Sequence, residues 1–427
     1  MTEVKFIIAK EHEDINVDEV CKEKLEKLFE ESKKFHSYLK LDKEFKVGYI
    51  IGIEWLTNEF VLVVEPKIEN LNYLSMFLEC LKHPVVLNEI NKDNDEKVYE
   101  IFLDEKPVNL DATQFEITPL LIINFLYVVK NIIKKGLKKD YVKVKENLTN
   151  RIKGKILTSP SIKENHLKNK INKNYCEYFN FTIDCPENRI IKKALLFARN
   201  YFITHKIITN IDYMSIIYQC LSAFTLVSDD VDVDTIKTIK ITPFYKEYKL
   251  GIRLAKMILK YFGYSINNTK KEKFPFPPFY INMPKLFELY VYSKLLEKYT
   301  SKDIVYQPQG NYGQPDFICK KENLKLIIDA KYKLIYYDIN EKESEYDYYD
   351  IEDIRQLSGY ARDKKILKIL NILKDDLEDK DIKVIDCIII YPNENGSDKI
   401  DDLLKTSING FLRFYKFGLK LPIKNNN

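Results

Sequence analysis

Two aspartates and one lysine in the last third of the chain have types and a spacing that suggest chemistry. Asp316 lies in the run QPDFIC, and Asp329 and Lys331 lie in the run LKLIIDAK, which follows after a short polar turn. Side chains alternate along a strand, so Asp329 and Lys331 are expected on one face. A hairpin turning at residues 322–323 would place Asp316 opposite Asp329, with the two Cβ atoms about 5 Å apart.

Two carboxylates this close repel each other unless a cation lies between them. Oxygen ligands favour a hard ion, Mg²⁺ or Mn²⁺. Such an ion can polarise a phosphoryl oxygen and lower the pKa of a bound water, and Lys331 could orient that water or offset charge in the transition state. The pattern by itself therefore predicts a metal-dependent hydrolase, with an ordinary hairpin bearing solvated charges as the alternative.

The segments around these residues predict the elements that would position them. They are a helix at 282–299, strands at 303–307, 314–320 and 324–332, an acidic loop at 338–350, a helix at 351–374 and a strand at 383–391. This order predicts a mixed sheet flanked by helices. Glu288 in the first helix is a candidate third metal ligand. Gln356 and Tyr360 share one face of the second helix and are candidate supporting residues, with ordinary packing or a helix cap as the alternative.

The rest of the chain predicts two further domains, so the fold class is α+β or α/β. Residues 1–116 are strand-rich, and the runs VGYIIGIEW and EFVLVVEPKI predict a hairpin whose second strand ends at Pro66. From 117 to 148 the apolar spacing is helical, with a helix end at Gly136, and 187–224 predicts two more helices. The prolines of PFPPF at 275–279 mark a boundary. The predicted domains are a strand-rich domain at 1–116, a helical and basic region at 117–270, and a domain at 271–427 that carries the candidate site.

Charge is distributed unevenly along the chain. The formal net charge is +4, yet residues 130–173 contain 14 Lys or Arg against 3 Asp or Glu. Such a stretch predicts a surface that contacts phosphate, or else a solvated helix face. The candidate DNA-binding residues are Lys138, Lys139, Arg151 and Lys153 in this stretch, and Lys333 and Arg355 beside the candidate site.

Other chemistries have little support in the sequence. The 7 Cys form no CxxC pair and the 5 His form no HxxxH spacing, which argues against a zinc site. There is no GxxxxGK[ST] motif, so we expect no nucleotide to be bound by this chain itself. The longest apolar stretch is too short for a bilayer, which needs about 20 residues, and the N-terminus lacks the pattern of a signal peptide. We therefore predict a cytoplasmic protein without membrane contact.

The order of these motifs resembles the PD-(D/E)xK nuclease superfamily. Longer stretches are similar to the McrC family, the nuclease subunits of McrBC modification-dependent restriction systems. They are VGYI (47–50), VEPKI (64–68), KKGLKKDY (134–141), ENLTNRIKGKI (146–156), CEYFNFTIDCPENRIIKKAL (176–195), LFELYV (286–291), QPDF (314–317), IIDAKYK (327–333) and IRQLSGYA (354–361).

The resemblance implies an endonuclease subunit of a GTP-dependent restriction complex. Its N-terminal portion would dock into a hexamer of the AAA+ GTPase McrB and stimulate GTP hydrolysis, and its C-terminal domain would cut double-stranded, often methylated, DNA with Mg²⁺. Asp316, Asp329 and Lys331 match the family's catalytic residues. Two alternatives stay open: a ring-docking activator with secondary or no nuclease activity, and a stand-alone DNA repair nuclease. The loop at 336–350 is expected to be a lid or a disordered insertion.

Overall fold

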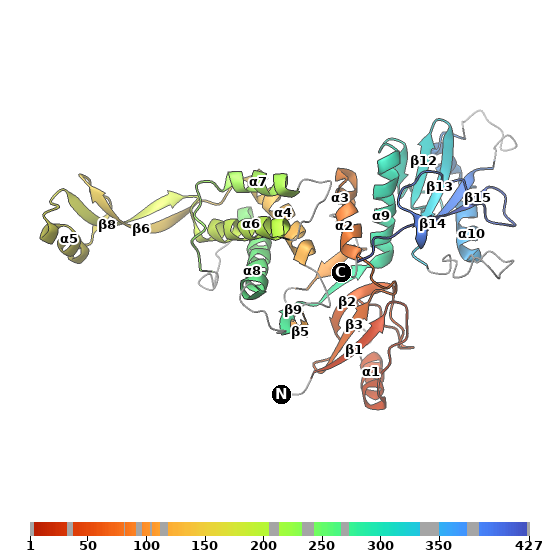
Figure 1. Ribbon diagram of the computed structural model, residues 1–427, viewed down its shortest axis with the longest axis horizontal. Coiled ribbons are helices and arrows are strands. Elements are labelled where there is room, and N and C mark those ends of the chain that lie inside the picture. The colour runs from red at the N-terminus through yellow and green to blue at the C-terminus, as the bar shows by residue number, and fades with distance from the viewer. Residues whose placement is uncertain are drawn as a thin grey trace. The chain divides into compact units, whose positions relative to one another are not determined.

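The protein divides into two compact units in the computed structural model (Figure 1). Unit 1 is formed by Met1–Leu110 together with Pro275–Asn427, and unit 2 by Asp111–Phe274. Each unit is described by itself. The structure describes residues 4–31, 37–80, 82–90, 96–102, 105–111, 118–204, 213–232, 243–265, 273–333, 350–373 and 384–424.

The first sheet of unit 1 has five strands in the order β1-β3-β2-β10-β4. Strands β2 and β3 form the predicted antiparallel hairpin, and β3 ends directly before Pro66, which cannot donate to a ladder. The strands are β1 (Lys5–Lys10), β2 (Ile50–Trp55), β3 (Phe60–Glu65), β4 (Tyr99–Ile101) and β10 (Phe279–Asn282), and the helices of this part are α1 (Glu19–Glu31), α2 (Tyr73–Cys80) and α3 (Pro84–Ile90).

Strand β10 joins the two ends of the chain into one unit. It lies between β2 and β4 and is antiparallel to both, although we predicted residues from 271 onward as a domain of their own. The expected boundaries at 116 and 270 fall close to the points where the chain passes between the units. The N-terminal and C-terminal segments, however, share a sheet. Their separate roles in docking and cutting stay a prediction.

The second sheet of unit 1 confirms the predicted mixed sheet flanked by helices. Its order is β11-β12-β13-β14-β15, antiparallel from β11 to β13 and parallel from β13 to β15. The strands are β11 (Ile304–Tyr306), β12 (Phe317–Lys321), β13 (Leu324–Ala330), β14 (Asp386–Ser397) and β15 (Phe414–Leu419), with β15 not expected from the sequence. The predicted acidic loop falls outside the described residues except for its last, Asp350.

Three helices accompany this sheet: α9 (Met283–Lys298), α10 (Ile351–Tyr360) and α11 (Lys364–Ile369). The single helix predicted at 351–374 is two helices. The reason is Asp363, whose carboxylate accepts hydrogen bonds from the backbone N–H groups of Lys365 and Ile366 and so begins a new helix. The N-terminus of α9 is capped in the same way by the side chain of Asn282, with Pro284 in the first turn.

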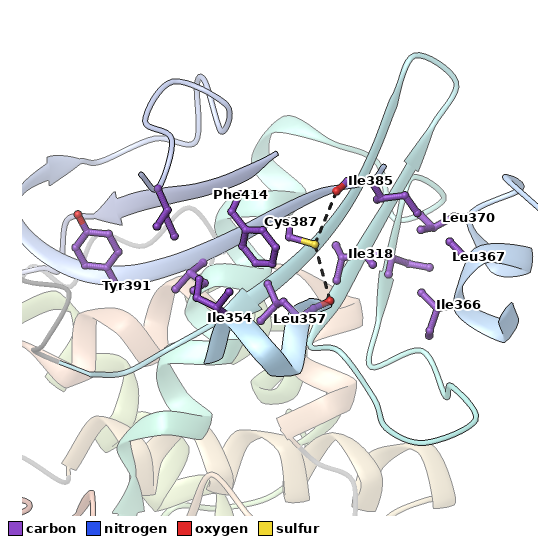
Figure 2. Packing of buried hydrophobic residues seen from close by; sticks show 13 residues of the cluster. Ile318, Ile354, Leu357, Ile366, Leu367, Leu370, Ile385, Cys387, Tyr391 and Phe414 are labelled. Atoms are coloured by element: carbon purple, nitrogen blue, oxygen red, sulfur yellow. Dashed lines mark hydrogen bonds between the residues drawn. The ribbon is translucent and has the colours of Figure 1, made fainter. Parts of the chain in front are cut away.

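One face of the second sheet packs against α10 and α11 in an apolar core (Figure 2). Ile318 of β12 and Ile327 of β13 lie directly opposite each other in the strand register and contribute to this core. Because side chains alternate along a strand, Asp316 and Asp329, each two residues from these isoleucines, belong to the same face. The carboxylates therefore lie at the edge of a packed core.

Unit 2 combines helices with a three-stranded sheet in the order β6-β8-β7. Helix α4 ends where Gly136 adopts φ 94°, as predicted, and α6 and α7 are the two further predicted helices. The elements are α4 (Thr118–Lys135), β6 (Asp140–Thr149), β7 (Lys155–Ile156), α5 (Thr158–Glu164), β8 (Lys173–Thr182), α6 (Pro186–Thr204), α7 (Tyr213–Ala223) and α8 (Glu247–Ser265). Among the described residues of the whole chain, no helix has the length and apolar character needed to cross a membrane.

The helical prediction for residues 117–148 is wrong beyond residue 135. Residues 140–149 form β6, which pairs antiparallel with β8 along ten residues. Val142 and Val144 alternate with Lys143 and Lys145, a period of two that favours a strand. The middle region is therefore partly β and not only helical.

Gly52 of β2 allows a test of the first sheet, in which β10 pairs with β2. Its φ is 146°, and an added Cβ would lie 2.1 Å from the carbonyl oxygen of Phe279 in β10. We expect Gly52→Ala to lower the free energy of unfolding by more than about 2 kcal/mol, measured by urea denaturation.

Gly359→Ala is the matched control for this substitution. It adds the same methyl group in α10, where no atom lies within 4 Å, so it should leave stability unchanged or raise it by up to about 1 kcal/mol. Equal stability of the Gly52→Ala variant and the wild type would contradict the described approach of β10 to β2.

Candidate active site

The hairpin of β12 and β13 brings the two predicted aspartates together. Phe317 lies opposite Ile328, and the same register continued by one residue places Asp316 opposite Asp329, as predicted. The backbone N–H of Ala330 donates a hydrogen bond of 2.7 Å to the Asp316 carboxylate. Asp316 is thus tied to β13, although it lies just before the first residue of β12.

Lys331 connects this hairpin to helix α10. Its ammonium group lies 2.5 Å from the Asp329 carboxylate and donates a hydrogen bond of 2.9 Å to the side-chain oxygen of Gln356. The side-chain nitrogen of Gln356 donates in turn to the hydroxyl of Tyr360 at 2.9 Å. The structure therefore brings Asp329, Lys331, Gln356 and Tyr360 into one chain of polar contacts.

Glu288 projects from α9 and is buried. Its carboxylate accepts hydrogen bonds from Lys285 at 3.1 and 3.2 Å and from Gln307 at 2.8 Å. Within the described parts of the chain, no group of three or more Asp, Glu, His or Cys residues is arranged to hold a metal ion. The structure thus brings Asp316 and Asp329 together but does not complete a three-carboxylate set with Glu288.

The negative charge of the aspartate pair is only partly compensated and would favour a bound cation. Burial raises the pKa of Asp316, and repulsion from Asp329 and Glu288 raises it further. Burial also raises the pKa of Asp329, while the Lys331 ammonium partly offsets this. Apart from that ion pair, the Oδ2 atom of Asp329 accepts no hydrogen bond from the described residues. Mg²⁺ is commonly held by one or two carboxylates together with waters and substrate phosphates, so the pair fits such an ion.

Asp353 is a site residue that the sequence analysis missed. It is buried in α10, and its carboxylate lies 3.5 Å from the Lys331 ammonium and accepts hydrogen bonds of 2.9 and 3.0 Å from Lys333. Asp353 could have been predicted from its position three residues before Gln356, because residues three apart lie on the same face of a helix. Lys333, a predicted DNA contact, is also paired with Asp350 at 2.7 Å, so it anchors α10 to the strand end.

The predicted DNA-binding residues of the middle region belong to unit 2 and have different environments. Lys138 is buried, with its ammonium 2.6 Å from Glu187 and 3.0 Å from Asp140. This placement does not fit a DNA contact, because the charge is already paired inside the protein. Lys139 and Arg151 are exposed, and the exposed Lys153 lies over the ring of Tyr178 at 4.0 Å.

A buried contact links the segment that follows β13 to the N-terminal segment. Tyr332, the residue after Lys331, donates a hydrogen bond of 2.7 Å to the Glu11 carboxylate, which also accepts one of 3.0 Å from the backbone N–H of Lys67. Burial raises the pKa of Glu11 to about 7. No local pattern could have predicted this contact, because its partners are 321 residues apart.

Comparison with known proteins relates this chain to a family. The family model described as McrBC 5-methylcytosine restriction system component matches residues 45–369, which is well over half of the chain and includes all six predicted catalytic and supporting residues. The chain belongs to the McrBC family. The McrBC restriction system that its motifs predicted is thus confirmed as its family. No curated protein matches it.

Two chains of solved structures are similar to this McrBC family member. One comes from the refined half-complex of the tetradecameric assembly of Thermococcus gammatolerans McrB AAA+ hexamers with bound McrC. It has 15% identity and a TM-score of 0.34, covering 97% of this chain and 94% of that one. The other comes from the cryo-EM structure of the Thermococcus gammatolerans McrBC complex, with 16% identity and a TM-score of 0.30, covering 68% and 87%.

The Glu11 carboxyl predicts a dependence of stability on pH. Its pKa is raised from 4.5 to about 7 in the folded state, so between these values the folded protein keeps a proton that the unfolded chain has released. The stability that this proton gives is present below pH 4.5 and is lost as the pH rises through 7, up to about 3 kcal/mol. Glu11→Gln cannot ionise, so urea denaturation should show it gaining stability relative to the wild type from pH 5 to 8.

The exposed Glu13 offers a control for this titration. Glu13→Gln makes the same chemical change outside the buried contact and should follow the wild type across the same pH range. A stability difference between Glu11→Gln and the wild type that does not change with pH would contradict a proton held by Glu11.

Proposed function

We propose that this chain is the metal-dependent endonuclease subunit of an McrBC-type restriction complex. It would hydrolyse phosphodiester bonds of double-stranded, often methylated, DNA, and stimulate GTP hydrolysis by an McrB-like AAA+ hexamer. The observation that carries the nuclease proposal is the strand register that sets Asp316 opposite Asp329, with the Lys331 ammonium beside them. The proposals that the partner is an AAA+ protein, that it hydrolyses GTP and that the DNA is methylated rest on family membership.

Each residue of the site has a separate task in this reaction. Asp316 and Asp329 would hold Mg²⁺ or Mn²⁺, which when bound supplies a polarised phosphate oxygen and a water of lowered pKa. Lys331 is placed to donate a hydrogen bond to that water or to a phosphate oxygen that gains charge. In hydrolysis the water oxygen bonds to phosphorus, the P–O ester bond breaks, and the proton lost by the water balances the leaving alkoxide.

Helix α10 would act by fixing the direction of the lysine. Gln356 accepts a hydrogen bond from Lys331 and donates one to Tyr360, and Asp353 faces the same ammonium group. A lysine restrained on three sides loses little freedom when the substrate binds. Gln356 and Tyr360 are therefore proposed as positioning residues.

Substitutions at the site test the proposal directly. Asp329→Asn and Lys331→Ala should each lower Mg²⁺-dependent DNA cleavage by at least about 100-fold when the partner GTPase and GTP are present. Both should still stimulate GTP hydrolysis. Asp316→Asn should abolish cleavage without lowering the melting temperature, because it removes one of two carboxyls that repel each other. Glu322→Gln in the exposed turn is the matched control.

Three outcomes would contradict the proposal. Cleavage that persists in the Asp329→Asn and Lys331→Ala variants would mean that the site lies elsewhere. Stimulation of GTP hydrolysis without any metal-dependent cleavage by the wild type would favour the activator. Efficient cutting by the purified chain, without nucleotide or partner, would favour a stand-alone nuclease.

The exposed cations of unit 2 are proposed to contact DNA phosphates. Lys139→Glu together with Arg151→Glu should weaken DNA binding and reduce the slope of log affinity against log salt by roughly 1 per residue. Lys405→Glu, an exposed change in unit 1, should leave the slope nearly as it is. Salt titration by fluorescence anisotropy measures this, and an unchanged slope in the double variant would exclude these two contacts.

A further inference from the structure

A hollow of about 890 Å³ opens beside the candidate active site. Its wall includes Gln356, whose side-chain oxygen accepts the hydrogen bond from Lys331, so one residue separates the hollow from the lysine of the proposed reaction. The rest of the wall comes from α10, from the start of α11 and from the loop that precedes Asp316, and includes Arg355, Arg362, Lys364 and Tyr312.

The loop that carries Tyr312 is held firmly at both sides. The Asp363 carboxylate accepts hydrogen bonds from the backbone N–H of Asn311 at 2.6 Å and from its side chain at 2.9 Å. Gly313 lies against the ring of Tyr360, where an added Cβ would be 2.6 Å from a ring carbon. Between these two anchors, the Tyr312 side chain is fully exposed. A solvated ring on a fixed backbone is suited to stacking with an unpaired base.

The charges of the wall favour a polyanion. Arg355, Arg362 and Lys364 are exposed, Arg355 in a solvent-exposed ion pair with Glu352 that a phosphate can replace. Asp363, the acidic residue among those that line the hollow, is engaged by the loop and by the start of α11. The Arg362 guanidinium donates to the Ser358 carbonyl oxygen at 2.8 Å, which orients it along the helix end. Guanidinium groups recognise phosphate through paired hydrogen bonds.

Gly359 lines the hollow without a side chain. It lies in α10, and a Cβ built on it would meet no atom within 4 Å. A nucleic-acid backbone can therefore approach the helix closely at this residue, which lies in the sequence between Arg355 and Arg362.

We propose that this hollow binds the DNA strand next to the phosphate that is cut. Arg355, Arg362 and Lys364 contact its backbone phosphates, and an unpaired base stacks on Tyr312. The inference rests on the proposed nuclease function, because it places the bound strand next to a phosphate that is cut. It adds a preference for DNA with unpaired nucleotides near the site of cleavage.

Binding of the full-length chain to DNA tests the proposal without any cleavage. Fluorescence anisotropy in the absence of divalent metal compares a fluorescein-labelled duplex that contains a single-stranded gap with the same duplex fully paired. Arg362→Glu with Lys364→Glu should weaken binding of both by on the order of tenfold or more. Tyr312→Ala should weaken binding of the gapped duplex by about five- to a hundredfold, and binding of the fully paired duplex much less.

Two further variants separate the hollow from general charge effects. Lys365→Glu with Lys368→Glu makes an equal charge change at two exposed residues of α11 that do not line the hollow, and it should cost far less affinity. Gly359→Leu fills the hollow without changing charge, and leucine suits a helix better than glycine. It should therefore lower DNA binding while the melting temperature stays the same or rises.

The outcomes distinguish this inference from the nuclease function. Unchanged DNA affinity in the Arg362/Lys364, Tyr312 and Gly359 variants would overturn the inference, even if the wild type cuts DNA with its partner. Unchanged DNA affinity combined with lost assembly with the partner GTPase would assign the hollow to a protein and would also overturn it. Affinity that falls as expected, in a chain that never cuts DNA with Mg²⁺ and its partner, would overturn the nuclease function alone.

Discussion

Asp316 and Asp329 bring two negative charges together at the end of a paired hairpin, and the structure only partly compensates for them. Lys331 and the Ala330 N–H stabilise the ionised forms, yet burial and mutual repulsion still raise the pKa of Asp316, and burial raises that of Asp329. A divalent cation would relieve this imbalance. The local cost in stability and the proposed chemistry therefore have the same physical cause, as is common at functional sites.

The rest of unit 1 can be understood as support for that hairpin. Lys331 reaches α10 through Gln356, and its backbone N–H donates to the carbonyl oxygen of Ile390 in β14 at 2.8 Å. The next residue, Tyr332, binds the N-terminal Glu11, and β10 lies within the first sheet. The segment that carries the proposed catalytic lysine, directly after β13, is thus in contact with the segment expected to dock the partner. Substitutions far from the hairpin in sequence can therefore affect it.

Basic composition alone is a poor guide to where DNA binds. Lys138 and Arg151 belong to the same basic stretch, but the first is buried in an ion pair and the second is exposed. Lys333 and Arg362 show the same contrast beside the proposed site, because Lys333 is held between two aspartates while Arg362 lines an open hollow. Charge attracts phosphate only where the fold leaves it accessible.

The sequence by itself determined the features that depend on near neighbours. Alternation along two short runs with a two-residue turn was enough to predict that Asp316 faces Asp329, and Pro66 and Gly136 end their elements for reasons of backbone geometry. The tertiary structure alone decided that β10 joins the first sheet, that Lys138 pairs with Glu187 and that Glu11 meets Tyr332. Lys138 and Glu187 are 49 residues apart in the sequence, and Glu11 and Tyr332 are 321 residues apart. Interactions between near neighbours cannot select a partner at such a distance.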